Sequence, residues 1–439
     1  MADFLICAAF LAIAARGKAP AAYHWGPIYT LEWVFMIWFA TYFFWLKKNW
    51  LTLLKHLKPW LFFLTWGVAL ALFDVFTQPD LLQLQNKYSL QRFIQHCVLF
   101  VYPILWTTVG YTFGQNRRNW ISGLLYGLCV VSAYTHLANL WFNNDSNMSI
   151  TWTSDGWAAN TALGPLSLFP LLALGWKAFW VGNIAFVAPL VTQWEIYVSR
   201  TYLLAILLDL GIAVLFIRQK LIPKAAVIGL TFAIGLISYL TLTPVPSLIK
   251  TKAQKQESVS LQDRATFALQ HADDVKQPGK ADQASTTPSS RPIIQARFRL
   301  FNWKTAIQDW KVSPVFGRRF IPEIPSFVMP EWPNTRGLES ATAPPVAGPH
   351  NSYLTVLTRM GIPGVVLMGW ILLSWFQAWR KISDFSETVR MLLFFVPFNG
   401  LLYAALNIGL ESPHQCVILW FMMGLGVSLA KGPLEFEAT

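Results

Sequence analysis

The sequence predicts an all-α polytopic membrane protein with about 12 transmembrane helices and one long loop outside the cytoplasm, between helices 9 and 10. The first observation is composition. The 439 residues are 54% hydrophobic and 15% aromatic, only 13% are charged, and the mean hydropathy is +0.42. A soluble domain carries about 25% charged residues, so a lipid bilayer is the solvent that suits this chain.

The second observation is the recurrence of apolar segments near the length of a membrane span, which is about 20 residues for a helix. The first segment is short for a span, and the sixth and seventh together are also compatible with a re-entrant hairpin. The twelve segments are 2–15, 27–46, 60–77, 93–114, 120–141, 161–176, 178–193, 201–217, 225–244, 354–379, 389–410 and 415–430.

The third observation is the distribution of charge between the spans. Basic residues cluster after the second, fourth, eighth and tenth segments, in loops that share one side of the membrane if every segment crosses. The positive-inside rule makes that side cytoplasmic, together with both termini. The same bias accounts for the net charge of +12 without nucleic acid as a partner. The clusters are Lys47, Lys48, Lys55 and Lys58; Arg117 and Arg118; Arg218, Lys220 and Lys224; and Arg380 and Lys381.

These patterns divide the chain into helices 1–9 at 1–244, an external loop at 245–350, and helices 10–12 at 351–439. Within the loop, 251–291 is rich in small and polar residues and is predicted to be a mobile insert. An amphipathic helix is predicted at 292–311 by apolar residues at alternating steps of three and four, which are Ile293, Ala296, Leu300, Trp303, Ile307 and Trp310. Residues 292–320 hold six Lys and Arg against one Asp, so the external surface is basic there and favours an anionic ligand.

Ionisable residues inside spans are costly and tend to be functional. Asp74, His96 and His136 are expected near the external ends of their helices, whereas Asp209 lies deeper in its segment. Two further candidates stand at the external ends of spans 8 and 10, a possible phosphate-binding arginine and a possible general base: Arg200 and His350. A purely interfacial role is the alternative for each of these residues.

No pattern predicts a cofactor. Cys7, Cys97, Cys129 and Cys416 are scattered through apolar segments, without the spacing of a metal site or a disulfide frame. Nucleotide-binding and metal-binding motifs are also lacking. If the protein transfers sugars, its donor is therefore expected to be already linked to a lipid.

Three strings, in this order and on the same expected side, resemble the O-antigen ligase and polymerase superfamily. They are VSRTYLL at 198–204, RLFNWKTAIQDWKVSPVFG at 299–317, with its Pro-x-x-Gly, and HNSYLTVLTRMGIPG at 350–364. One departure is local. The family often has a second glycine shortly after the Pro-x-x-Gly, whereas this chain has two arginines in GRRF at 317–320.

The resemblance implies an O-antigen ligase. Such an enzyme transfers polysaccharide from undecaprenyl diphosphate to a sugar hydroxyl of lipid A-core, in a metal-independent, inverting-type reaction at the periplasmic face of the bacterial inner membrane. His350 matches the family's essential histidine, and Arg200 and Arg299 match its diphosphate-binding arginines. The supporting candidates are Asn351, Tyr353, Arg318, Arg319 and His136.

Other functions remain compatible with the sequence. Within the superfamily, an O-antigen polymerase and a protein O-oligosaccharyltransferase carry similar motifs and differ in the acceptor. A lipid or glycan transporter is the alternative from a different class. Transporters usually show internal repeats and polar groups near the membrane midplane, whereas the polar groups of this chain collect toward one side.

Overall fold

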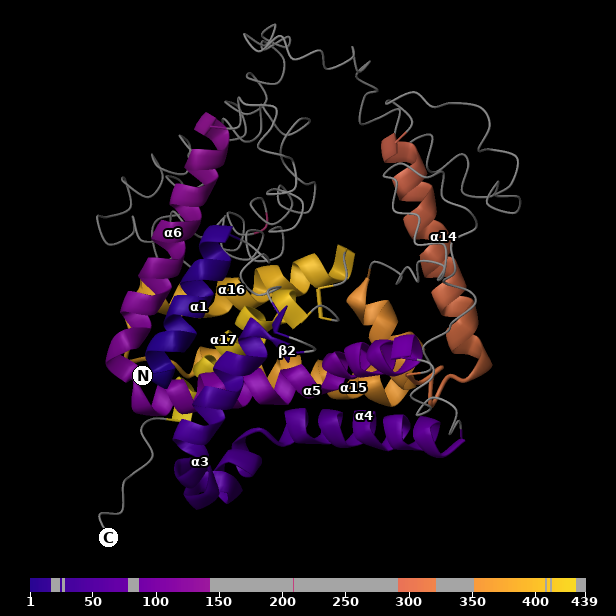
Figure 1. Ribbon diagram of the computed structural model, residues 1–439, viewed down its shortest axis with the longest axis horizontal. Helices are drawn as coiled ribbons and strands as arrows, with labels where there is room; N and C mark the ends of the chain where they lie inside the picture. The colour runs from indigo at the N-terminus through magenta and orange to yellow at the C-terminus, as the bar shows by residue number, and fades with distance from the viewer. Residues whose placement is uncertain are drawn as a thin grey trace, which may run out of the picture.

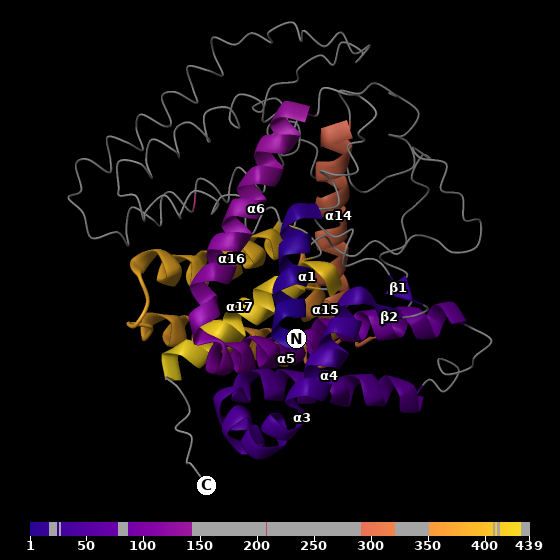
Figure 2. The ribbon, with the colours of Figure 1, turned by 60° about the vertical axis from the view of Figure 1, so that its left-hand side comes forward.

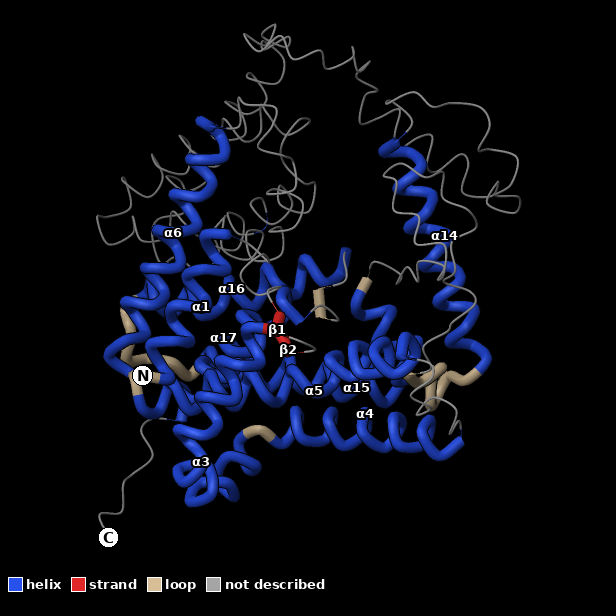
Figure 3. The backbone as a smooth tube through the Cα atoms, viewed as in Figure 1, coloured by secondary structure: helices blue, strands red, loops and turns tan. Residues whose placement is uncertain are grey.

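The computed structural model describes residues 1–16, 24–25, 28–77, 87–142, 208, 291–320, 351–406, 409–410 and 413–431. Among them the chain is helical except for one small antiparallel hairpin, in which β1 (His24–Trp25) pairs with β2 (Ile28–Tyr29) (Figure 3). The all-α expectation is therefore confirmed for the described residues, apart from this hairpin.

Most helix bounds follow the apolar segments of the sequence, because each segment satisfies its own backbone hydrogen bonds only as a helix in lipid, whereas α3 and α5 extend several residues beyond their segments. A single 3₁₀ turn at Arg118–Trp120 links α5 to α6. The helices are α1 (Ala2–Arg16), α3 (Thr30–His56), α4 (Lys58–Thr77), α5 (Lys87–Asn116), α6 (Ile121–Phe142), α14 (Arg291–Val312), α15 (Ser352–Arg380), α16 (Glu387–Leu406) and α17 (Pro413–Lys431).

Within the described part, four helical stretches are long and apolar enough to cross a membrane, and two shorter helices are also apolar. Apart from Leu208, the expected segments between 161 and 244 lie outside the described residues, so the count of twelve stays a prediction. The four stretches are Lys58–Thr77, His96–Asn116, Ser352–Arg380 and Glu387–Ala405, and the shorter ones are Ala2–Ile13 and Cys416–Lys431.

The helices run in two main directions. In Figure 1, α4, α5 and α15 lie side by side as a layer, and α17 packs along α5. In Figure 1, α6, with α1 against it, and α14 rise from opposite ends of this layer, and the turned view in Figure 2 shows that both rise to the same side of it. One end of the layer is therefore next to α1 and α6, and the other end is next to α14.

Small residues bring α5 and α17 into backbone contact. A Cβ added to Gly110 would lie 1.9 Å from the carbonyl oxygen of Phe421, and one added to Gly424 would lie 2.0 Å from that of Thr107. The Thr107 hydroxyl donates to the Trp420 carbonyl at 3.2 Å. Close approach through small residues and interhelical hydrogen bonds is how helices associate in lipid, where apolar burial gives little driving force.

At one end of the layer, ion pairs join segments that are far apart in the chain. Arg117 Nε lies 2.7 Å from the buried carboxylate of Asp3, and Arg118 lies 2.7 Å from Asp384. The start of α1, the α5–α6 junction and the α15–α16 junction therefore meet at this end. They are three of the segments that the sequence analysis places on one side of the membrane.

The end of α3 reaches the same region. Nδ1 of His56 lies 2.6 Å from the hydroxyl oxygen of the buried Tyr111 on α5. Burial lowers the pKa of His56 below its ordinary value, and the positive charges of Lys431 and Lys55 lower it further. The imidazole is therefore held in its neutral form near pH 7.

Candidate functional site

The candidate site is built around the segment that follows α14, residues 313–320, which we call the docking segment. It folds as a compact turn because Pro314 cannot continue the helix and Gly317 adopts a φ of 63°. The Gly317 N–H donates to the Ser313 carbonyl at 2.8 Å. The Trp310 indole N–H donates to the Pro314 carbonyl at 3.1 Å and fixes the turn to the last part of α14.

The docking segment binds α15 through backbone hydrogen bonds. The Arg318 N–H donates to the Thr358 carbonyl at 2.6 Å, and the Arg319 N–H donates to the Arg359 carbonyl at 2.9 Å. In return, the Ile362 N–H donates to the Pro314 carbonyl at 2.9 Å. These bonds occupy backbone groups of α15 next to its kink, where the helical ladder is interrupted.

Glycines at both sides of the contact make it this close. Gly361 interrupts α15 with φ 66° and ψ −167°, and a Cβ there would lie 2.0 Å from the Val315 carbonyl oxygen. A Cβ on Gly317 would lie 2.6 Å from the Thr358 carbonyl oxygen. The Pro-x-x-Gly of the docking segment and the Met-Gly of α15 are thus two halves of one backbone contact.

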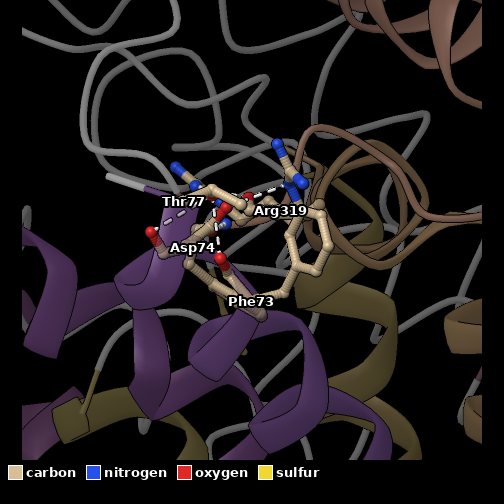
Figure 4. A network of polar contacts seen from close by, with 6 residues as sticks. Phe73, Asp74, Thr77 and Arg319 are labelled. Atoms are coloured by element: carbon tan, nitrogen blue, oxygen red, sulfur yellow. Dashed lines mark hydrogen bonds and ion pairs between the residues drawn. The ribbon is translucent and has the colours of Figure 1, made fainter. Parts of the chain in front are cut away.

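A buried carboxylate anchors the other side of the docking segment. Asp74 on α4 has no exposed surface, and its Oδ1 lies 2.9 Å from Nε of Arg319 (Figure 4). Its Oδ2 accepts the Phe320 N–H at 2.7 Å. The Arg319 guanidinium also lies over the Phe73 ring, with 4.6 Å between the guanidinium carbon and the ring centroid. An unpaired carboxylate inside a span is costly. The docking segment offsets this cost, because it supplies a guanidinium group and an N–H donor to Asp74.

A second arginine connects this pair to α5. Arg359 on α15 is 6% exposed, and its Nη1 donates to the Arg319 carbonyl at 3.2 Å. Its Nη2 lies 3.1 Å from Nε2 of His96 on α5. We call Asp74, His96, Arg319, Phe320 and Arg359 the Asp74 cluster. It joins α4, α5, α15 and the docking segment.

The packing of α14 differs from the expected apolar stripe. The stripe expected at Trp303, Ile307 and Trp310 leaves Ile307 exposed, and the buried positions are offset from it by about one residue. Polar bonding explains the offset. Arg318 Nη2 pairs with Asp309 at 3.2 Å, and the Thr358 hydroxyl lies 3.5 Å from the Ala306 carbonyl. The buried positions are Asn302, Ala306 and Asp309.

The start of α15 is firmly capped. The Asn351 side chain accepts the N–H groups of Tyr353 and Leu354 at 3.0 and 3.1 Å, which satisfies two of the free donors of the first turn. The Tyr353 hydroxyl donates to the Leu401 carbonyl on α16 at 3.1 Å. The Ser352 hydroxyl oxygen accepts the Leu410 N–H at 3.0 Å. The residue that follows position 350 therefore begins a helix whose first turn is fixed to its neighbours.

The sequence-predicted residues fall into two groups. Arg200 and His350 lie outside the described residues, and for Arg299 on α14 and His136 on α6 only the backbone is described. The others are placed in full. The structure gives Arg318 and Arg319 carboxylate partners, and it gives Asn351 and Tyr353 roles in fixing α15. Asp74 and His96, expected near the external ends of their helices, both belong to the Asp74 cluster.

Sequence reasoning overlooked Arg359. The residue stands inside the apolar segment 354–379, where an ionisable side chain is itself a sign of function. It also lies in the string that starts at His350. The principle that singled out Asp74 and His96 would have found Arg359 as well.

The long apolar helices, their close lipid-type packing and a polar cluster at one end of the layer define a multi-pass membrane protein. Residues 196–369 match the O-antigen ligase family. The matched part of the chain is therefore assigned to that family, and the resemblance seen in its motifs is confirmed. The match supports a function within the O-antigen ligase and polymerase superfamily. A comparison with curated proteins returns no match.

Proposed function

We propose that this protein is an O-antigen ligase, a metal-independent enzyme that transfers polysaccharide from undecaprenyl diphosphate to a sugar hydroxyl of lipid A-core. The observation that carries the proposal is the family match over 196–369, because it contains Arg200, Arg299 and His350 together. In this proposal Arg200 and Arg299 hold the diphosphate and His350 is the general base.

The chemistry follows from these residue types. His350 takes the proton of the acceptor hydroxyl while the hydroxyl oxygen attacks the anomeric carbon of the donor sugar. The bond from that carbon to the diphosphate oxygen breaks, and undecaprenyl diphosphate leaves with the electron pair. Attack opposite the leaving group inverts the anomeric centre. Fixed guanidinium groups stabilise the negative charge that develops on the diphosphate.

The described geometry supports a site built between α14 and the start of α15. Arg299 stands three residues before the buried Asn302 in α14, so helical periodicity puts the two positions on the same side of the helix. The docking segment then binds α15 at Thr358 and Arg359, two turns after the capped Asn351. Backbone bonds thus set the register between the helix with Arg299 and the helix that follows His350.

The proposal includes a location. The protein lies in the bacterial inner membrane with about 12 helices, and 245–350 is a periplasmic loop between helices 9 and 10. The donor and acceptor both carry lipid tails and reach the site from the membrane. The meeting of the basic junctions at the end opposite α14 supports this orientation, because the positive-inside rule assigns that end to the cytoplasm.

The test is product formation by the purified protein in detergent, with an undecaprenyl diphosphate-linked glycan as donor. Three acceptors are offered separately: lipid A-core, a second lipid-linked glycan and a serine peptide. Transfer to lipid A-core is expected. Transfer confined to the lipid-linked glycan would make the protein a polymerase, and transfer confined to the peptide would make it a protein O-oligosaccharyltransferase. In a separate assay, with the protein reconstituted in vesicles, a donor that crosses the membrane without glycan transfer would indicate a transporter.

The role of His350 is tested in the same assay. His350→Ala is expected to lose about 100-fold to 10,000-fold of the transfer rate, the usual contribution of a positioned base. His271→Ala, in the predicted insert, is the matched control and should behave as wild type. Wild-type activity should fall at acidic pH, as the ring takes up a proton, and EDTA should leave it unchanged. A His350→Ala rate within a few-fold of wild type would remove the general base from the mechanism.

A further inference from the structure

The ion pair between Asp74 and Arg319 is unusual in two respects. Asp74 is fully buried on a membrane-spanning helix, whereas its partner comes from the docking segment, far along the chain. The backbone of Arg319 has a φ of 63°, in the left-handed region that residues other than glycine rarely adopt. This is the region where the related family often has a second glycine.

The strained conformation is held from both sides. The Arg319 N–H donates to the Arg359 carbonyl at 2.9 Å, and the Arg319 carbonyl accepts from Arg359 Nη1 at 3.2 Å. The Arg319 side chain then reaches Asp74, and the next N–H, that of Phe320, fills the second carboxylate oxygen. Non-glycine residues persist in this conformation only where their surroundings over-determine it, and such residues cluster at functional sites.

The Asp74 cluster lies where it connects α14 to α15 and α5. On one side it holds the docking segment, which leads directly out of α14, and on the other it holds α15 at Arg359 and α5 at His96. We propose that Asp74 and Arg319 are positioning residues for glycan transfer, which fix α14 relative to the first turns of α15. This inference rests on the proposed function, because α14 carries Arg299 and α15 follows His350. Neither Asp74 nor Arg319 needs to touch the substrates.

Four variants separate the side-chain charge from the backbone conformation. Asp74→Asn keeps an acceptor for the Phe320 N–H but removes the negative charge, and Asp74→Ala removes both. Arg319→Lys keeps the charge, whereas Arg319→Gly relieves the left-handed backbone and removes the ion pair. Asp384→Asn is the matched control, because it breaks an exposed ion pair with Arg118 at the other end of the layer, where such pairs contribute little.

The first measurement is hydrogen exchange of the full-length protein in detergent, followed by mass spectrometry, and it needs no activity. In wild type the N–H groups of residues 318–320 are bonded to Thr358, Arg359 and Asp74. Asp74→Ala and Arg319→Gly should raise their exchange, whereas exchange in α17 stays as in wild type and shows that the fold is intact. Arg319→Lys and Asp384→Asn should resemble wild type.

The second measurement is kinetic. Asp74→Ala and Arg319→Gly should lower kcat by about 10-fold to 100-fold, the effect of small misplacements of catalytic groups, with the KM for the acceptor little changed. Asp74→Asn should fall between Asp74→Ala and wild type, and Arg319→Lys should restore most of kcat. An Arg319→Gly protein with wild-type kcat and wild-type exchange would overturn the inference. A wild-type protein that transfers no glycan would instead refute the proposed function, and exchange would still decide whether the ion pair holds the docking segment.

Discussion

The indole N–H of Trp66 on α4 donates to the carbonyl of Met360 on α15 at 2.9 Å. That carbonyl stands just before Gly361, and Pro363 within the next turn has no N–H to donate. Freed backbone groups in a membrane helix must find partners elsewhere. Trp66 supplies one of these partners, and the Pro314 carbonyl supplies another through the Ile362 N–H. The kink in α15 is therefore a feature shared by α4, α15 and the docking segment.

Gly361→Ala should separate α15 from the docking segment. The φ of 66° and ψ of −167° at Gly361 lie in a region that is essentially restricted to glycine and costs other residues about 1–3 kcal/mol, and the new Cβ would also meet the Val315 carbonyl oxygen at 2.0 Å. We expect a lower thermal midpoint in detergent and a strong loss of transfer. Gly369→Ala in the same helix is the control, because a Cβ there meets nothing within 4 Å. Equal melting of the two variants would show that the contact at Gly361 is not tight.

Replacement of Arg200 or Arg299 by alanine should abolish most of the transfer activity, and replacement by lysine should restore little of it. Lysine keeps the positive charge but lacks the planar fork that binds two phosphate oxygens. The expected defect is in the use of the diphosphate donor, seen as a lower kcat/KM for the donor at matched protein levels. Lys304→Ala, at an exposed position on the same helix as Arg299, is the control. Normal transfer by both alanine variants would place the donor site elsewhere.

Reporter fusions should show the sidedness of the loops. Fusions at 115–119, 219–224 and 382–386 are expected to read cytoplasmic, and a fusion at 270 external. The Arg118–Asp384 ion pair requires the first and third sites to agree with each other. A cytoplasmic reading at 270 would invert the topology and separate the periplasmic substrates from the proposed site.

His56 should make stability depend on pH. Burial lowers its pKa in the folded protein, whereas the unfolded chain keeps a value of about 6.5. The unfolded state therefore binds the proton more readily. Stability that is present above about pH 6.5 is lost as the pH falls from there toward the folded pKa. Thermal midpoints at about pH 5.5 and about pH 7.5 should differ less in His56→Gln than in wild type. An unchanged difference would assign the effect to other groups.

Hydropathy predicted the described helices to within a few residues, except that α3 and α5 extend well beyond their apolar segments. Each backbone in lipid must form its own hydrogen bonds, so the helices are a local property of the chain. The apolar segment 60–77 also showed that Asp74 is an ionisable residue inside a span, where a charge is costly without a partner. Periodicity does not name the partner, however, and Arg319 is brought to Asp74 only by the turn at Gly317.

The sequence predicted which residue types take part in the candidate site, but it did not predict which residues contact one another. The two arginines of GRRF, Arg318 and Arg319, were predicted from the sequence as supporting residues of the site, and in the structure they make ion pairs with Asp309 and Asp74. The buried side of α14 was predicted with an offset, because the apolar stripe cannot reveal that Asp309 is buried by its arginine partner. Long-range pairing of this kind depends on the tertiary fold, which a single sequence does not display.

The glycine contact between α5 and α17 has a consequence for biosynthesis. The two helices are separated by about 300 residues of chain, from Asn116 to Pro413. At about 5–20 residues per second, a ribosome needs on the order of 15–60 s to deliver α17 after α5 has emerged. During that time the surface of α5 around Gly110 waits in the bilayer without its partner. The pairing of α5 with α17 is therefore a late step of biosynthesis, which cannot begin before Pro413–Lys431 has been synthesised.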